Sequence, residues 1–276
     1  MAVWGASPIA TKIAVAHLSA PMVAILRTLW AAALLLPVAC AGRLPRPCSA
    51  GEWAPLVVSG LCGFVGFPVL FTYGVQLTTA SHAALILALA PVSTGLLAAV
   101  LERHPVSGRW IAGAAVALVG EGALVLFRLG LRGAPESVVG DALVLCGLLC
   151  GTAGYVVGAR VSRVYGSWST TVWGIALSGI AVLPAFALLL PHTPWASVTP
   201  GEWISVGYLA VMVSIVGYVA WYWALASGGI ARVGLAQFGQ PIVTVALALI
   251  MLHEAVTVPL VLAGASILAG IYLARE

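Results

Sequence analysis

Three ionisable side chains lie well inside long apolar runs of the sequence: Lys12, Arg27 and Glu121. Lys12 is also the only lysine in the chain. An isolated charge is costly in apolar surroundings, so each of these groups needs a partner. We expect Glu121 to neutralise one cation while the other attracts an anionic group, such as a carboxylate, of a small molecule. A purely structural ion pair explains the three residues equally well, because ion pairs also fix helix register.

Two amides form a second candidate site. Gln237 and Gln240 are three residues apart in an apolar run, so on a helix they share one face. Amides exposed to an apolar solvent would be costly, which predicts that both point into the protein. There they either hydrogen-bond another helix or contact a bound small molecule, and the spacing fits both readings.

Composition identifies the solvent around these residues. Hydrophobic residues make up 62% of the 276 and charged residues only 7%, against about 25% charged in an ordinary soluble domain. In lipid, a spanning helix needs about 20 mostly apolar residues, because its backbone must satisfy its own hydrogen bonds. The sequence therefore predicts an all-α polytopic membrane protein, and its net charge of +4 requires no nucleic-acid partner.

Charged residues, prolines and glycines divide the chain into ten apolar segments. The expected spans are 2–17, 22–41, 54–77, 81–101, 109–128, 140–160, 168–190, 203–226, 231–252 and 257–274. The first has no basic leader and no small-residue cleavage site, so we expect a retained helix and not a signal peptide.

The tripeptide Gly-Glu-Trp occurs twice, at 51–53 and at 201–203. The same offset of 150 aligns Val69 with Val219 and Pro91 with Pro241. Each copy contains five spans, an odd number, so the second copy must enter the membrane from the opposite side. The sequence thus predicts two inverted-topology repeats, over residues 1–130 and 138–276, an arrangement typical of transporters.

The repeat singles out two further pairs of residues. Pro91 and Pro241 lie inside apolar segments, where proline removes a backbone hydrogen bond and can kink a helix, and matched positions favour a gating role over simple packing. Tyr73 and Trp223 also occupy matched positions. We expect these two to border a cavity, with the interfacial aromatic belt as the alternative.

The basic residues predict orientation, because cytoplasmic loops are enriched in Lys and Arg. With the N-terminus inside, the inner set is Arg43, Arg46, Arg103, Arg109, Arg160, Arg163, Arg232 and Arg275, and the outer set is Arg128 and Arg132. We therefore expect both termini to be cytoplasmic, in a multi-pass protein of the inner (plasma) membrane.

Several stretches resemble the ten-helix drug/metabolite transporter superfamily of the EamA type. They are WGASPIATK (4–12), ILRTLWAAALLL (from 25), ASHAALILALAPVSTGLLAAVLE (ending at 102), GDALVLCGLLCGTAGYVVGARVSR (from 140) and YVAWYWALASGGIARVGLAQFGQPIVTVALALIMLHE (218–254). The resemblance covers nearly the whole chain. It implies a transporter, and it does not specify the substrate, since members carry amino acids, other metabolites and drugs.

These observations together predict a secondary transporter that exports small metabolites, such as amino acids, by alternating access. The expected partners are a small-molecule substrate and the lipid bilayer, while proton or other ion coupling and the oligomeric state stay open. No HExxH, GxSxG or GxxxxGK[ST] motif occurs, so we expect no enzyme, no metal or other cofactor and no ATP drive. The alternative is a non-transporting membrane scaffold or receptor subunit.

Overall fold

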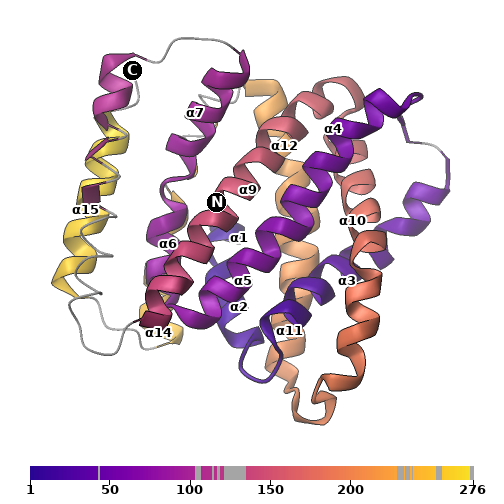
Figure 1. Ribbon diagram of the computed structural model, residues 1–276, viewed down its shortest axis with the longest axis horizontal. Helices are drawn as coiled ribbons and strands as arrows, with labels where there is room; N and C mark the ends of the chain where they lie inside the picture. The colour runs from indigo at the N-terminus through magenta and orange to yellow at the C-terminus, as the bar shows by residue number, and fades with distance from the viewer. Residues whose placement is uncertain are drawn as a thin grey trace.

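A computed structural model describes residues 1–42, 44–102, 107–113, 115–116, 119–120, 135–228, 233, 237, 239–252 and 257–273. Within these residues every regular element is a helix, and Figure 1 shows the helices packed as a bundle. This confirms the all-α prediction and follows from composition, because an apolar segment in lipid must satisfy its own backbone hydrogen bonds.

The first half of the chain contributes helices that match four of its five expected spans. They are α1 (Ala2–Gly5), α2 (Ser7–Ala14), α3 (Ala20–Cys40), α4 (Ala50–Leu61), the π-helix η1 (Cys62–Gly66), α5 (Phe67–Leu77), α6 (Ala80–Leu87) and α7 (Ala90–Glu102). The fifth expected span, 109–128, lies mostly outside the described residues.

The second half repeats this order. Its helices are α9 (Pro135–Tyr165), α10 (Ser167–Leu189), two short 3-10 turns η2 (Leu190–His192) and η3 (Trp195–Ser197), α11 (Pro200–Tyr208), the π-helix η4 (Leu209–Gly217), α12 (Tyr218–Gly228), α14 (Gly239–Met251) and α15 (Val258–Leu273).

Five helices within the described residues are long and apolar enough to cross a membrane. They are Ala20–Cys40, Ala50–Leu77, Val138–Tyr165, Ser167–His192 and Pro200–Gly228. Shorter apolar helices at His82–Leu97 and Val261–Gly270 add to them. The set fits the predicted ten-helix fold of two five-helix repeats.

The third helix of each repeat contains a π-helical segment. In the first repeat η1 separates α4 from α5, and in the second η4 separates α11 from α12. The two π segments end at Gly66 and Gly217, which are 151 residues apart. π-helical turns inside α-helices are rare and occur frequently at functional sites.

The two repeats pack on each other through glycines. A Cβ added to Gly60 would lie 2.9 Å from the carbonyl oxygen of Gly174, and one added to Gly154 would lie 2.9 Å from the nitrogen of Gly63. Such close backbone approach is typical of membrane helices, which associate by van der Waals packing of small residues. It brings α4 and η1 of the first repeat against α9 and α10 of the second.

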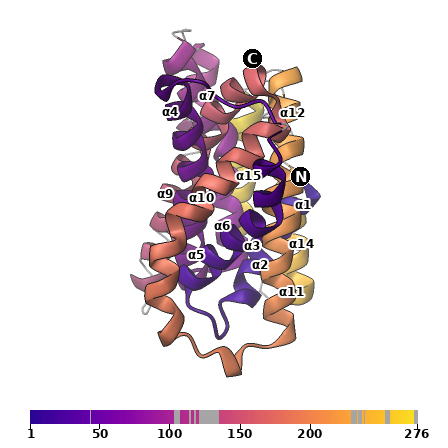
Figure 2. The ribbon, with the colours of Figure 1, turned by 90° about the vertical axis from the view of Figure 1, so that its right-hand side faces the viewer.

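α4 and α11 begin at opposite ends of the bundle. Figures 1 and 2 show α4 starting at the upper end, whereas the connection from α10 to α11 lies at the lower end. The two Gly-Glu-Trp tripeptides, which lie in the first turns of these helices, are therefore on opposite faces of the molecule. This is the placement that an inverted repeat requires.

Candidate functional site

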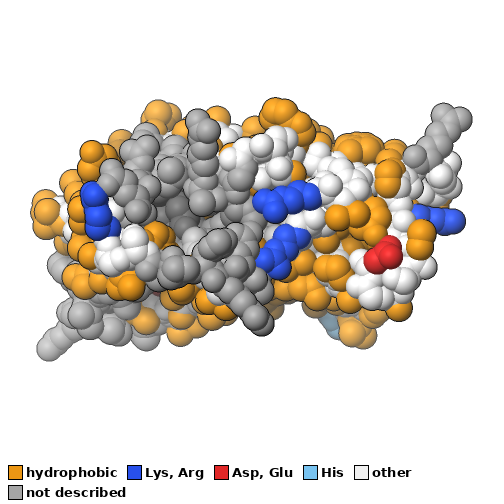
Figure 3. Space-filling model, turned by 90° about the horizontal axis from the view of Figure 1, so that it is seen from above, with side chains coloured by type: hydrophobic (Ala, Val, Ile, Leu, Met, Phe, Trp, Pro, Cys, Tyr) orange, Lys and Arg blue, Asp and Glu red, His pale blue; other side chains and the backbone are white. Residues whose placement is uncertain are grey.

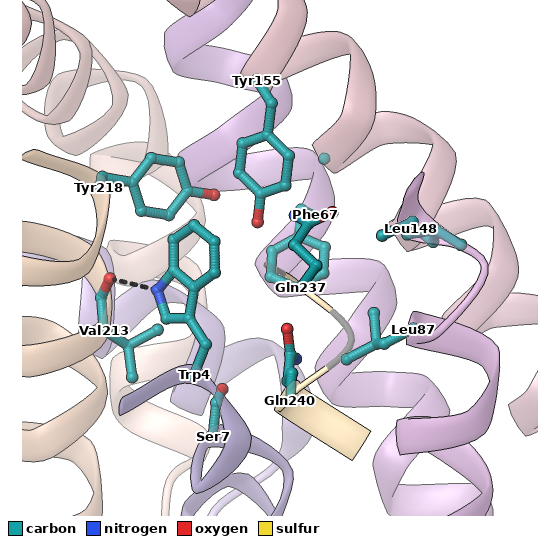
Figure 4. Close-up of a pocket in the computed structure, with 12 residues that line it drawn as sticks. Trp4, Ser7, Phe67, Leu87, Leu148, Tyr155, Val213, Tyr218, Gln237 and Gln240 are labelled. Carbon is teal, nitrogen blue, oxygen red and sulfur yellow. Dashed lines mark hydrogen bonds between the residues drawn. The ribbon is translucent and has the colours of Figure 1, made fainter. Parts of the chain in front are cut away.

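A small cavity lies between the two repeats (Figure 4). Its free volume is about 30 Å³, which is room for about two water molecules. It is lined by Trp4, Ser7, Phe67, Leu87, Ala90, Leu148, Gly151, Tyr155, Val213, Tyr218, Gln237 and Gln240. The lining combines aromatic rings with a few polar groups, the composition expected of a small-molecule site.

An aromatic cluster forms one side of the cavity. Trp4 stacks on Tyr155 with ring centroids 5.5 Å apart and meets Tyr218 edge-on at 5.5 Å. The Trp4 indole N–H donates a hydrogen bond to the carbonyl oxygen of Val213, at 3.2 Å (Figure 4). The Tyr218 hydroxyl donates to the carbonyl oxygen of Gly63, at 2.9 Å. These contacts fix the orientation of the rings and join the first helices of the two repeats.

The cavity is lined by equivalent positions of the two repeats. Trp4 and Tyr155 stand in the first helix of each repeat and differ by 151 positions, the offset that also relates the ends of the two π segments. Phe67 and Tyr218, which begin α5 and α12, differ by the same number. The site therefore lies where the two repeats meet, as an inverted-repeat transporter would place it.

Equivalent positions of the two repeats differ in polarity at the cavity. Leu87 and Ala90 of the first repeat correspond, at an offset of 150, to Gln237 and Gln240 of the second. Both glutamines are buried, and the side-chain oxygen of Gln237 has no hydrogen-bond partner among the described residues. A buried acceptor without a partner costs free energy, which a ligand that donates a hydrogen bond would recover.

Arg27 is a buried cation near the tyrosines of the cavity. Its side chain is 1% exposed, and it donates one hydrogen bond to the Ser214 hydroxyl, at 3.1 Å. Its Nε and Nη1 atoms have no partner within the described part of the chain. The guanidinium is close enough to Tyr155 and Tyr218 to interact electrostatically with both phenols. It therefore places positive charge beside the cavity without lining it.

Lys12 caps a helix. Its ammonium group donates to the carbonyl oxygens of Val75 at 2.9 Å, Gln76 at 3.4 Å and Thr78 at 2.6 Å, at the end of α5. A cation is favourable there, because the last carbonyls of a helix lack helical partners and carry the negative end of its dipole. Lys12 is absent from the cavity lining formed by the described residues.

The remaining predicted site residues have different placements. Tyr73 is 39% exposed and Trp223 is 65% exposed, and neither lines the cavity as described. Pro91 is the second residue of α7 and Pro241 the third of α14. Glu121, the expected partner of a cation, lies outside the described residues. The roles of these residues stay predictions.

Sequence reasoning missed the aromatic lining, namely Trp4, Phe67, Tyr155 and Tyr218. The spacing of Trp4 to Lys12 recurs between Tyr155 and Arg163. This pattern could have identified Trp4 and Tyr155 as equivalent positions of the two repeats. These residues correspond at an offset of 151, so an alignment of the two repeats at an offset of 150 does not pair them.

A model of the EamA-like transporter family matches residues 1–126 and 138–275. Over 215 residues the chain is 33% identical to "Uncharacterized transporter YdeK" of Bacillus subtilis (strain 168), covering 77% of this chain and 72% of that protein. Over 241 residues it is 30% identical to "Probable terminal-alkyne amino-acid exporter" of Streptantibioticus cattleyicolor, covering 84% and 75%.

A solved structure titled only "Crystal structure of protein" matches with a TM-score of 0.66 and 24% identity. The match covers 99% of this chain and 92% of that one, and it supports the fold alone.

Proposed function

Because the chain belongs to the EamA-like transporter family, we propose that it exports small amino acids or related metabolites through the cavity between its repeats. The single observation that carries this proposal is the cavity lining, in which two buried amides lie among apolar and aromatic residues, with a buried cation nearby.

The charges and polar groups suit a zwitterionic substrate. A carboxylate near the Tyr155 and Tyr218 rings would be stabilised by the positive charge of Arg27. An ammonium group on the same substrate can donate hydrogen bonds to the Gln237 and Gln240 side-chain oxygens. Its side chain would then pack against Phe67 and the other apolar residues of the lining. The relative whose name gives it as an amino-acid exporter supports this substrate class.

The size of the cavity supports alternating access. A space for about two water molecules is too small for an amino acid, so the helices around it must separate to admit one. In inverted-repeat transporters such opening alternates between the two faces as one half rocks against the other. The energy source, whether a proton, another ion or exchange, is left open in this proposal.

We further propose that the arginine-rich face is cytoplasmic and that the protein resides in the plasma membrane. Figure 3 shows basic side chains on the face seen from above. Arg46 lies four residues before the start of α4, and Arg160 and Arg163 lie near the end of α9, which are elements of that face. Cytoplasmic loops carry such an excess of Arg and Lys.

The test is transport by purified protein in liposomes. A panel of labelled amino acids is offered to the wild type, to Gln237→Leu with Gln240→Ala, and to Gln76→Leu. The double variant gives the second repeat the residues of the first, Leu87 and Ala90. Gln76 is exposed and remote from the cavity lining, so it provides the matched control.

We expect the wild type to transport at least one amino acid. The transport rate should fall about tenfold or more in the double variant, since a lost buried hydrogen bond is worth about 1–3 kcal/mol. Gln76→Leu should transport at the normal rate. Absence of transport for every amino acid offered would contradict the proposed substrate class. Equal rates in all three proteins would show that the amides do not contact the substrate.

A further inference from the structure

Each Gly-Glu-Trp tripeptide makes contacts across the boundary between the repeats. Glu202, in α11 of the second repeat, reaches His17, which follows α2 in the first repeat. Glu52, in α4 of the first repeat, reaches Tyr165, the last residue of α9 in the second. In both copies the glutamate therefore joins the third helix of one repeat to the end of the first helix of the other.

The Glu202 contact joins a buried carboxylate to a half-exposed histidine, and the carboxylate accepts several hydrogen bonds. One carboxylate oxygen accepts from the His17 backbone N–H at 2.7 Å, and the other lies 3.2 Å from His17 Nδ1. The second oxygen also accepts from the backbone N–H and the hydroxyl of Thr199, at 2.7 and 2.8 Å. The Glu202 side chain is 1% exposed. We name the contact between Glu202 and His17 the Glu202 latch.

The equivalent contact on the opposite face is exposed and has fewer bonds. A Glu52 oxygen accepts from the Tyr165 hydroxyl at 2.7 Å and from the Cys48 backbone N–H at 3.0 Å. Glu52 itself is exposed. We name the contact between Glu52 and Tyr165 the Glu52 latch.

The tryptophans of the two tripeptides cross the same boundary. Trp203 stacks on Trp30 of α3, with ring centroids 5.5 Å apart and planes at 1°. Trp53 meets Trp173 of α10 edge-on, also at 5.5 Å. Because α3 and α10 are the second helices of their repeats, both tripeptides make the same pair of inter-repeat contacts.

From these contacts we propose that the two latches are the gates of the transport cycle, one for each face. This proposal rests on the alternating access proposed above. To open the cavity at one face, the third helix must separate from the first helix of the other repeat, and that movement breaks the latch of that face. Both latches are formed in this structure, and the cavity between them is small. The more extensive Glu202 latch makes its face the more firmly closed of the two.

The test measures access to the cavity and needs no substrate. A Ser7→Cys reporter, which lines the cavity, is introduced after the five natural cysteines are replaced. A membrane-impermeant methanethiosulfonate reagent is then applied from one side of the membrane or the other, to whole cells and to inverted vesicles.

Breaking one latch should open one face. Glu202→Gln should raise the reporter's labelling rate about tenfold from the face that bears His17, and leave the other face unchanged, because one charge-assisted hydrogen bond biases a two-state equilibrium by about that factor. Tyr165→Phe, which removes a single hydroxyl, should raise labelling from the opposite face only. Wild type should label faster from the Tyr165 face than from the His17 face.

Thr199→Ala is the matched control. It removes the hydroxyl that caps the start of α11 and hydrogen-bonds Glu202, and it leaves the contacts of Glu202 with His17 in the first repeat in place. It should leave labelling unchanged from both faces. If it acts like Glu202→Gln, or if Glu202→Gln and Tyr165→Phe both change labelling without preference for a face, the latches are only structural and the proposal is wrong. Face-selective labelling together with failed transport would keep the latches and reject the proposed substrate.

Discussion

Gly217 leaves the space in which the Trp4 side chain lies. A Cβ added at this position would lie closer to the Trp4 Nε1 atom than real Cβ contacts do. That nitrogen donates to the Val213 carbonyl, and the indole ring stacks on Tyr155. One glycine therefore allows the aromatic cluster to join the first helix of the chain to the third helix of the second repeat.

Replacing Gly217 with alanine should displace the indole. We expect Gly217→Ala to destabilise the protein by about 1–3 kcal/mol, the usual range for overpacking a core, and to lower transport. Gly207→Ala is the control, since its nearest neighbour, an atom of Trp30, would be at an ordinary 3.5 Å. Thermal unfolding in detergent measures both variants, and equal melting temperatures would show that Trp4 moves without cost.

The buried Arg27 and the partly exposed Lys12 have separate expected effects. Arg27→Met should weaken binding of an amino acid about tenfold or more, the effect of losing an interaction with a charged group. The carboxamide analogue of that amino acid, which has no carboxylate charge, should bind to Arg27→Met as tightly as to the wild type. Lys12→Met removes hydrogen bonds to the end of α5 and should lower the melting temperature without changing affinity. Titration of both ligands by calorimetry tests this. A loss of affinity in Lys12→Met instead would assign the carboxylate to Lys12.

The sequence identifies equivalent residues better than it identifies inward faces. Phe71 and Trp221, matched at an offset of 150, are 0% and 4% exposed, whereas Tyr73 and Trp223 are 39% and 65% exposed. Two residues along a helix turn the side chain by about 200°. Each repeat therefore has one of these aromatic side chains inside the bundle and one outside. In lipid the outer face is apolar too, and hydrophobic periodicity cannot choose between them.

The direction of the two amide side chains can be predicted from the sequence. Gln237 and Gln240 were predicted to point inward because lipid excludes amide groups, and both line the cavity. The aromatic residues carry no such penalty, so the sequence predicts inward-pointing amides but does not indicate which aromatic rings line the cavity.

At the scale of elements, the helix interruptions coincide with the cavity. α6 ends at Leu87 and α7 begins at Ala90, and both of these residues line it. Pro91 follows at once, within the first turn of α7, where its missing N–H leaves no helical bond unmade. Pro241 stands within the first turn of α14, next to Gln240. Interrupted helices at a central site are a feature of inverted-repeat transporters.

Removing the interruption should impair movement and not folding. Alanine at position 91 supplies an N–H that can donate to the carbonyl of Leu87, which would allow α6 and α7 to continue as one helix. Because Pro91 stands in the first turn of α7, this exchange should cost little stability. We expect Pro91→Ala to keep or raise the melting temperature while the transport rate falls. Pro184→Ala, at an exposed position inside α10, is the control for losing any helical proline. Full transport by Pro91→Ala would remove Pro91 from the gating set.

At the scale of the whole molecule, composition and duplication were sufficient to predict the architecture. Unpaired backbone groups are costly in lipid, so apolar segments of this length form helices. The repeated tripeptide predicted that the second half of the chain is an inverted copy of the first. The paired contacts of Glu52 and Glu202 were not predictable in the same way. They depend on which helix ends meet across the repeat boundary, and hydropathy does not encode that.

The orientation of the whole molecule can be tested at the same tripeptides. Gly51 and Gly201 are exposed, and no atom beyond their chain neighbours would come closer than 3.9 Å to a side chain placed on either. Single cysteines there, in a cysteine-free background, should react with an impermeant reagent from opposite sides of the membrane, Gly51→Cys from the cytoplasm. We expect this orientation because arginines lie near that end of the bundle and translocate poorly. Labelling of both cysteines from one side would contradict the inverted repeat, and opposite labelling with Gly201→Cys reacting from the cytoplasm would reverse the proposed orientation while leaving the fold intact.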